Sequence, residues 1–252
     1  MRTFGLIGKS LSHSFSQQYF TEKFLQQNIK DAKYYHFQIA NIQEVNEFLK
    51  QPAMHGFNIT IPYKTEIIPF LDELDDIAQE VGAVNCIVKR NNKWIGYNTD
   101  VEGFEIMLQK KIIQKSKNDY GHIPLWPSAL VLGSGGAAKA VCYVLKQKNI
   151  SFQIVSRNKN TETITYNEVS DIVINHSKLI INTTPLGMFP FTDALPKIPY
   201  HALNNNNILI DLIYNPEETL FLEKGKKHGA LTMNGLKMFE GQADASYKIF
   251  NP

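Results

Sequence analysis

Short apolar runs alternate with segments of helical periodicity along the whole chain. In the first half this pattern predicts a βαβαβ order. Strands are expected at Thr3–Ile7, Tyr34–Ile39 and Phe57–Ile61, and helices after Ser14 and from Asn41 to Leu49. Two further strand-like runs, Cys86–Lys89 and Trp94–Tyr97, flank Asn91-Asn92. That pair is typical of a two-residue hairpin turn, so an antiparallel ribbon is expected there.

The second half repeats strands and helices after a polar break. A predicted helix from Val101 to about Lys111 leads into Lys115–Pro127, which lacks periodicity and holds prolines and a glycine, so we place a domain boundary there. Strands are then expected at Ala129–Leu132, Phe152–Val155, Leu179–Ile181, Ile208–Leu212 and, more weakly, Ala230–Thr232. The last segment, Leu236–Phe250, is expected to be a helix. This alternation predicts an α/β fold with a mostly parallel sheet covered on both faces.

The composition excludes several classes of protein. With 252 residues, 43% of them apolar and 20% charged, the chain can bury one large core or two modest ones. Lys and Arg number 26 against 24 Asp and Glu, so neither nucleic acid nor a membrane surface is expected as a partner. The two cysteines lack the spacing of a metal or redox pair, which predicts a cytoplasmic protein without a metal site. Neither a signal peptide nor a membrane-spanning run is expected.

A glycine-rich loop is the strongest single motif. Gly133-Ser134-Gly135-Gly136-Ala137-Ala138 fits the dinucleotide-binding pattern and lies between a predicted strand and an alanine-rich helix. The first glycine permits a tight turn, the second lets backbone amides approach a pyrophosphate, and the small third position lets helix and strand pack closely. The alternative is a βα turn without a ligand. The strand-turn-helix context favours dinucleotide binding.

The residues after the next strand distinguish NAD from NADP. An NAD site usually carries an acidic residue about 20 positions after the loop. This chain instead has Ser156-Arg157-Asn158-Lys159. Arg157 can bind a 2′-phosphate through two hydrogen bonds and stack on adenine, whereas a carboxylate would repel that phosphate. The pattern favours NADP, and a solvated basic turn is the alternative.

Three polar segments lie beside strand ends in the first half. Ser10–Ser16 brings several hydroxyl groups to a helix start, where one can cap the helix and others can hold a small anion; an ordinary cap with spare serines is the alternative. Asn58–Lys64 ends a strand on a lysine, a residue type that lies on the surface in most proteins. Gly96–Asp100 ends a strand and starts a helix, so Asp100 is either a helix cap or a catalytic carboxylate.

Taken together, these motifs resemble the shikimate dehydrogenase family. The match keeps the order of the family and spans nearly the whole chain. It runs through His13-Ser14-Phe15-Ser16, Asn58-Ile59-Thr60-Ile61-Pro62-Tyr63-Lys64, Gly82-Ala83-Val84-Asn85, Asn98-Thr99-Asp100-x-x-Gly103, the Gly133 loop, Asn182–Met188, Asp211–Pro216, Gly235 and Gln242.

The resemblance implies a two-domain α/β enzyme. Residues 1–105, completed by the C-terminal helix 236–252, would form a substrate domain. Residues 106–235 would form a Rossmann-type NADP-binding domain, with the site in the cleft between the two. The enzyme would interconvert 3-dehydroshikimate and shikimate in the shikimate pathway, which leads to chorismate and the aromatic amino acids. It would act on small molecules in the cytoplasm as a monomer or homodimer.

The resemblance also implies roles for individual residues. Lys64 and Asp100 would be the catalytic pair, and they are the only lysine and carboxylate at strand ends within the three polar segments. A lysine in a cleft can donate a proton to the forming alkoxide while a neighbouring carboxylate orients it. The substrate would be bound by Ser14, Ser16, Thr60, Asn85, Tyr214 and Gln242. The cofactor would be bound by Gly133, Ser134, Gly135, Gly136, Ala137, Ser156, Arg157, Asn158, Thr183, Ile213 and Gly235.

Some positions depart from the family pattern. Gln17 replaces a usual proline, and Cys86 replaces a usual threonine. The cofactor turn lacks a second arginine, which is Thr161 here, and Lys159 is a candidate substitute. Two other functions are considered: an NAD-linked quinate/shikimate dehydrogenase, and a dinucleotide-binding sensor without catalysis. The absence of an acid after Val155 argues against the first, and the presence of both Lys64 and Asp100 argues against the second.

Overall fold

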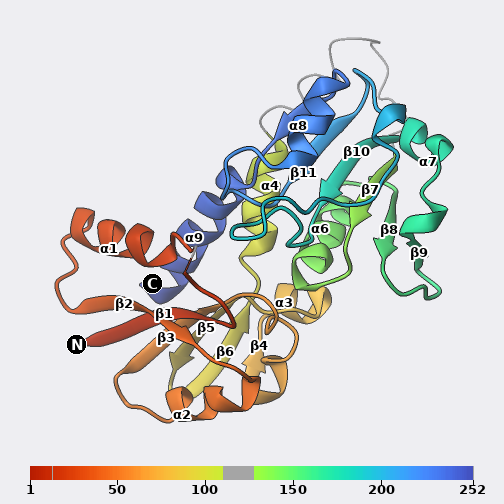
Figure 1. Ribbon diagram of the computed structural model, residues 1–252. Helices are drawn as coiled ribbons and strands as arrows, with labels where there is room; N and C mark the ends of the chain where they lie inside the picture. The colour runs from red at the N-terminus through yellow and green to blue at the C-terminus, as the bar shows by residue number, and fades with distance from the viewer. Residues whose placement is uncertain (13, 110–127, 252) are drawn as a thin grey trace. The chain divides into compact units, whose positions relative to one another are not determined.

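The structure, a computed structural model, describes residues 1–12, 14–109 and 128–251. The chain divides into two compact units (Figure 1): unit 1 is Met1–Gly103 with Gly241–Pro252, and unit 2 is Phe104–Glu240. His13, the expected end of a helix near Lys111 and the boundary predicted within Lys115–Pro127 lie outside the described residues. Each unit contains a sheet of mainly parallel strands, which confirms the predicted α/β class.

Unit 1 is built on a six-stranded sheet with the order β2-β1-β3-β5-β6-β4. Its strands are β1 (Arg2–Gly8), β2 (Ala32–Gln38), β3 (Met54–Ile59), β4 (Glu73–Leu74), β5 (Cys86–Arg90) and β6 (Lys93–Tyr97). β1 pairs in parallel with β2 and β3, and β5 pairs antiparallel with β3 and β6. The expected antiparallel ribbon is present, because Asn91 and Asn92 both adopt the positive φ that its tight turn requires.

Apolar side chains cover both faces of this sheet. Its helices are α1 (Ser16–Gln26), α2 (Val45–Leu49), α3 (Asp76–Val81), the start of α4 (Asp100–Gln109) and most of α9 (Leu236–Phe250). Alternate residues of β1 point to opposite faces, so that Phe4 and Ile7 belong to different core clusters. Phe4 stacks on Phe250 of α9 with ring centroids 4.7 Å apart. Helix α9, which has the predicted bounds, therefore supplies part of the core of unit 1.

Unit 2 has an entirely parallel six-stranded sheet with the order β12-β11-β10-β7-β8-β9. The strands are β7 (Ser128–Leu132), β8 (Phe152–Ser156), β9 (Thr163–Thr165), β10 (Ser177–Asn182), β11 (Ile208–Asp211) and β12 (Leu231–Met233). Counted within the unit, this is the 3-2-1-4-5-6 order of a Rossmann fold. Ligands of this fold bind beyond the carboxyl ends of the strands, where the order reverses, which here is between β7 and β10.

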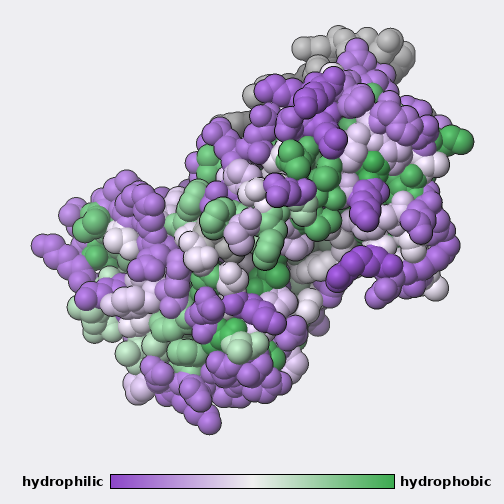
Figure 2. Space-filling view, viewed as in Figure 1, coloured by the Kyte–Doolittle hydropathy of each residue, from purple (hydrophilic) through white to green (hydrophobic). Residues whose placement is uncertain are grey.

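The helices α6 (Gly136–Gln147), α7 (Asp171–His176) and α8 (Leu220–Lys227) lie between strands of this sheet along the chain. α6 directly follows β7, and its buried residues are Ala138, Ala140, Val141, Val144 and Leu145. The face of the molecule in Figure 2 is mainly hydrophilic, with hydrophobic residues in small groups. Within the described residues, no helix combines the length and the apolar composition needed to cross a membrane.

Candidate active site

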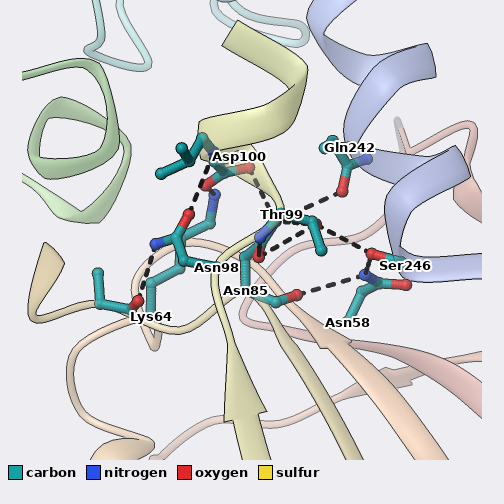
Figure 3. A network of polar contacts seen from close by, with 10 residues as sticks. Asn58, Lys64, Asn85, Asn98, Thr99, Asp100, Gln242 and Ser246 are labelled. Atoms are coloured by element: carbon teal, nitrogen blue, oxygen red, sulfur yellow. Dashed lines mark hydrogen bonds and ion pairs between the residues drawn. The ribbon is translucent and has the colours of Figure 1, made fainter. Parts of the chain in front are cut away.

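A buried ion pair forms the centre of the candidate site in unit 1. Lys64 lies in the turn after β3, where its carbonyl accepts a hydrogen bond from the Val84 N–H at 2.7 Å. Asp100 is the first residue of α4. The Lys64 Nζ is 2.5 Å from the Asp100 Oδ2, and their side chains are only 14% and 6% exposed. The structure thus brings the two predicted catalytic residues into direct contact (Figure 3).

The cap of α4 comes from Asn98 and leaves the carboxylate of Asp100 available. The Asn98 Oδ1 accepts a hydrogen bond from the Val101 N–H at 3.3 Å, and its Nδ2 donates to the Ala83 carbonyl at 2.8 Å. The sequence left two alternatives for Asp100, a helix cap or a catalytic carboxylate. Its carboxylate contacts the side chains of Lys64 and Asn85.

Asn85 joins the ion pair to two further residues of the site. Its Nδ2 donates to the Asp100 Oδ1 at 2.9 Å and lies 3.4 Å from the Gln242 Oε1 of α9. Its Oδ1 accepts the Thr99 N–H at 2.6 Å. Four of the predicted site residues, which are Lys64, Asn85, Asp100 and Gln242, are therefore linked by direct contacts.

Two serines form a second polar group at the start of α1. The Ser14 hydroxyl accepts the Ser16 N–H at 3.2 Å, and the two hydroxyl oxygens are 3.2 Å apart. Helix α1 begins at Ser16, and its N-cap Phe15 makes no side-chain cap bond, so the Ser14 hydroxyl is the side-chain group that meets the first amide of the helix. Thr60 is half-buried directly after β3, with its N–H bonded to the Ile7 carbonyl at 2.9 Å.

The glycine-rich loop of unit 2 has the geometry of a dinucleotide site. Gly133 has φ +113°, and a Cβ there would lie 2.5 Å from the Thr183 Oγ1, so only glycine fits. Thr183 in turn donates its hydroxyl to the Leu132 carbonyl at 2.8 Å, across the switch point between β7 and β10. A Cβ on Gly135 would meet nothing within 4 Å, which leaves open space before the first amides of α6. The residues present therefore fit a bound pyrophosphate.

The turn after β8 places an exposed cation beside two hydroxyl groups. The Ser134 and Ser156 hydroxyl oxygens are 3.1 Å apart, and Arg157 and Asn158 are exposed next to them. Lys159 forms an ion pair with Glu168, which lowers the pKa of that carboxyl to about 2. This pairing argues against Lys159 as the substitute for the missing arginine.

A buried carboxylate, Asp211, holds the loops that follow β10 and β11. It accepts hydrogen bonds from the Thr219 hydroxyl at 2.6 Å, the Asn182 Nδ2 at 3.0 Å and the Ile213 N–H at 3.1 Å. Asn182 also accepts from the backbone N–H and hydroxyl of Thr184. Asp211 thereby fixes the segments that carry two predicted cofactor contacts, Thr183 and Ile213.

The remaining predicted residues of unit 2 lie close to this segment. A Cβ on Gly235 would lie 2.0 Å from the Leu212 carbonyl oxygen, so its glycine is required by the approach of two backbone segments. The Gly235 N–H donates to the Ile213 carbonyl at 2.9 Å. Tyr214 packs against Phe239 with ring centroids 4.7 Å apart.

Burial raises the pKa of Asp211 from 3.8 to about 6, and its three hydrogen bonds act in the opposite direction. Between these two pH values the folded protein keeps a proton that the unfolded chain has lost, so stability falls as pH rises through this window. Asp211→Asn removes this titration. The difference in unfolding free energy, variant minus natural protein, should therefore increase by about 2 kcal/mol between about pH 4.5 and about pH 8.

Urea unfolding of both proteins at the two pH values measures this change. Asp193→Asn, at an exposed carboxylate of the same unit, is the matched control and should show a much smaller change. If the difference in unfolding free energy between the Asp211→Asn variant and the natural protein stays constant with pH, the raised pKa of Asp211 is contradicted.

Sequence reasoning assigned no role to Asp211, to its hydrogen-bond partners, or to the polar residues around Asn85. These are Asn58, Asn98, Thr99, Asn182, Asp211, Thr219 and Ser246. One usable signal was present, because Ser246 follows Gln242 by four residues and lies on the same side of the final helix. Within the described part of the chain, no group of three His, Cys, Asp or Glu side chains could hold a metal ion.

Comparisons with known proteins give one consistent result. The family model for the shikimate dehydrogenase substrate binding domain matches residues 6–87. A shikimate dehydrogenase (NADP(+)) of Methanococcus maripaludis is 38% identical, over 98% of this chain and 90% of that protein.

Solved structures agree with this sequence match. Shikimate dehydrogenase 1 from Peptoclostridium difficile superposes with a TM-score of 0.83 at 35% identity, covering 99% of this chain and 91% of that one. The Thermus thermophilus shikimate 5-dehydrogenase, solved with NADP(H) and shikimate, has a TM-score of 0.84 at 26% identity. The match covers 100% of this chain and 94% of that one.

Proposed function

Because this chain belongs to the shikimate dehydrogenase family, we propose that it catalyses the reversible reduction of 3-dehydroshikimate to shikimate with NADPH. The observation that carries this proposal is the buried Lys64–Asp100 ion pair, bound to Asn85 and thereby to Gln242. A protein that only binds a dinucleotide has no need of such a pair. The proposed place of the enzyme is the shikimate pathway, which leads to chorismate and the aromatic amino acids.

The chemistry follows from the reduction of a ketone to an alcohol. NADPH supplies the hydride when it is bound. The Lys64 Nζ donates a proton to the oxygen on which negative charge develops. Asp100 orients the ammonium group through its Oδ2, while Asn85 holds the other oxygen of the same carboxylate. In shikimate oxidation the same lysine takes the proton back.

Substrate and cofactor contacts are assigned to the residues that the sequence predicted. Ser14 and Ser16 would bind the carboxylate of the substrate, since their hydroxyl groups are adjacent at a helix start. Thr60, Asn85 and Gln242 would bind its ring hydroxyl groups, and Tyr214 would lie near its carboxylate. The cofactor contacts proposed are Gly133, Ser134, Gly135, Gly136, Ala137, Ser156, Arg157, Asn158, Thr183, Ile213 and Gly235.

A spectrophotometric assay tests the proposal. Purified protein is given shikimate or quinate, each with NADP or NAD, and the reduced nicotinamide is followed by its absorbance. Shikimate with NADP should give the highest kcat/KM. Higher activity with quinate and NAD would favour the quinate dehydrogenase alternative. Cofactor binding without turnover of either substrate would favour the sensor alternative.

Arg157→Ala tests the choice of cofactor. Loss of the guanidinium should raise the KM for NADP by about 10- to 100-fold, because a charge-assisted bond to the 2′-phosphate contributes about 1–3 kcal/mol. The kinetics with NAD should change little. Lys159→Ala is the matched control, since Glu168 already holds that lysine. An equal loss with both dinucleotides would contradict the role of Arg157.

The cytoplasm is the proposed compartment, on the basis of the cysteine usage. The proposed partners are the small-molecule substrate and NADP, with a monomer or a homodimer as the assembled form. Sedimentation of the purified protein distinguishes these two forms.

A further inference from the structure

A continuous chain of hydrogen bonds leads from Tyr34 of β2 to Asp100. The Tyr34 hydroxyl donates to the Asn58 Oδ1 at 2.8 Å, and the Asn58 Nδ2 donates to the Ser246 Oγ at 2.8 Å. The Ser246 Oγ lies 3.0 Å from the Thr99 Oγ1, which accepts a hydrogen bond from the Asn85 Nδ2 at 2.9 Å. Figure 3 shows the part of this network that runs from Asn58 and Ser246 to the Lys64–Asp100 pair.

Backbone groups fix the orientation of both amides in this network. The Thr99 N–H can only donate, so the atom of Asn85 that it meets must be the oxygen. The backbone carbonyl oxygen of Asn85 can only accept, so the side-chain atom of Asn58 that lies 3.3 Å from it must be the nitrogen. Asn85 therefore always presents its N–H groups toward the carboxylate of Asp100, and a flipped amide would lose bonds at both ends.

Ser246 is the point at which this network meets the final helix. Its side chain is fully buried, and its hydroxyl contacts Asn58 of β3, Thr99 before α4 and the thiol of Cys86 on β5. Removing that hydroxyl leaves buried partners without one of their bonds.

The side-chain nitrogen of Asn85 has fewer hydrogens to donate than there are acceptor oxygens around it. Its Nδ2 carries two hydrogens and faces the Asp100 Oδ1 and the Thr99 Oγ1, both at 2.9 Å, and the Gln242 Oε1 at 3.4 Å. Ser246 holds the Thr99 hydroxyl in place, so that one hydrogen goes to threonine and the other to aspartate. If the threonine side chain turned away, the hydrogen that it accepts would go to the Gln242 Oε1, and the amide would rotate toward that glutamine and out of its present alignment with Asp100.

We propose that Ser246 and Thr99 are positioning residues that hold Asn85, and through it Asp100, in the arrangement needed for proton transfer at Lys64. The proposal rests on the proposed dehydrogenase function. It assigns to the final helix a role in the chemical step, in addition to its contribution to the core.

The experiment compares Ser246→Ala and Thr99→Val with the matched control Ser177→Ala. Ser177 is also buried and donates one hydrogen bond, to the Val173 carbonyl at 2.7 Å in unit 2. We expect kcat to fall by about 5- to 20-fold in each of the first two variants, in line with the loss of one buried hydrogen bond. The KM for NADP should stay within about twofold, and Ser177→Ala should keep the natural kcat.

Two readouts separate positioning from a merely structural loss. Slower proton transfer should raise the solvent deuterium isotope effect on kcat, whereas a smaller fraction of folded enzyme lowers kcat and leaves that effect unchanged. The double variant Ser246→Ala/Thr99→Val should be no slower than Thr99→Val alone, because both residues act through one chain.

Several outcomes would overturn the proposal. One is a solvent deuterium isotope effect on kcat that is the same in Ser246→Ala and Thr99→Val as in the natural protein. Another is a loss of kcat in these two variants no larger than that in Ser177→Ala. Full additivity of the two substitutions would also contradict it. The proposed function fails separately, if the unmodified protein itself does not turn over shikimate with NADP.

Discussion

Replacing Lys64 by alanine is expected to lower kcat by about 10²–10⁴-fold while the KM for shikimate changes much less. The lysine is argued to act on charge that develops in the transition state, so its loss should affect the chemical step more than binding. Steady-state kinetics in both reaction directions measure this effect. Near-normal kcat would leave Asp100 or a bound water as the proton carrier and would overturn the assignment.

Stability must be measured with activity, because the substitution leaves a carboxylate that is only 6% exposed without its cation. Breaking such a buried pair from one side costs about 3–5 kcal/mol of unfolding free energy. The double variant Lys64→Ala/Asp100→Asn removes both charges and should recover part of that stability. Its kcat should stay near that of the poorer single variant, since the two residues act as a unit.

Replacing both Ser14 and Ser16 by alanine is expected to raise the KM for shikimate strongly with little effect on NADP. Each lost hydrogen bond to the substrate carboxylate contributes about 1–3 kcal/mol, so the double variant should lose about 2–6 kcal/mol of shikimate-binding free energy. Titration calorimetry of shikimate binding to the enzyme checks the result independently of turnover.

The two serines differ in their structural roles, so single variants are also informative. The Ser14 hydroxyl accepts the Ser16 N–H, and its loss also removes a bond at the start of α1. Ser16→Ala keeps that bond and is the cleaner test. Ser12→Ala, at an exposed hydroxyl in the same segment, should leave the kinetics unchanged. If the double variant is folded and keeps the natural KM, the carboxylate must bind elsewhere.

The Rossmann unit could be predicted in detail because its signals are local. Its central strands are continuous buried apolar runs, and a glycine-rich turn links β7 to α6, which begins one residue before the expected Ala137. The short strands β4 and β9 were not predicted, since two or three residues carry no usable periodicity. Helix α3 was missed for a similar reason, since its six residues form fewer than two turns.

The polar network of unit 1 could be predicted only in part. Lys64 and Asp100 stood out because they end polar segments beside strands, but their contact spans 36 residues of sequence. The contact between Asn58 and Ser246 spans 188 residues, and no local pattern relates an asparagine of one strand to a serine in the last helix. Such pairings follow from the packing of whole elements, which periodicity alone does not specify.

Unit 1 is discontinuous, because residues from Gly241 onward complete a body that begins at Met1. During synthesis the first 103 residues leave the ribosome long before the segment that packs Phe250 against Phe4. All of unit 2 is made between the two segments of unit 1. Every strand of the unit 2 sheet has therefore been synthesised while the sheet of unit 1 still lacks the cover provided by α9. The newly made chain therefore exposes an unfinished apolar face on its first unit until the segment from Gly241 onward has been made. During that interval the chain depends most on protection from aggregation.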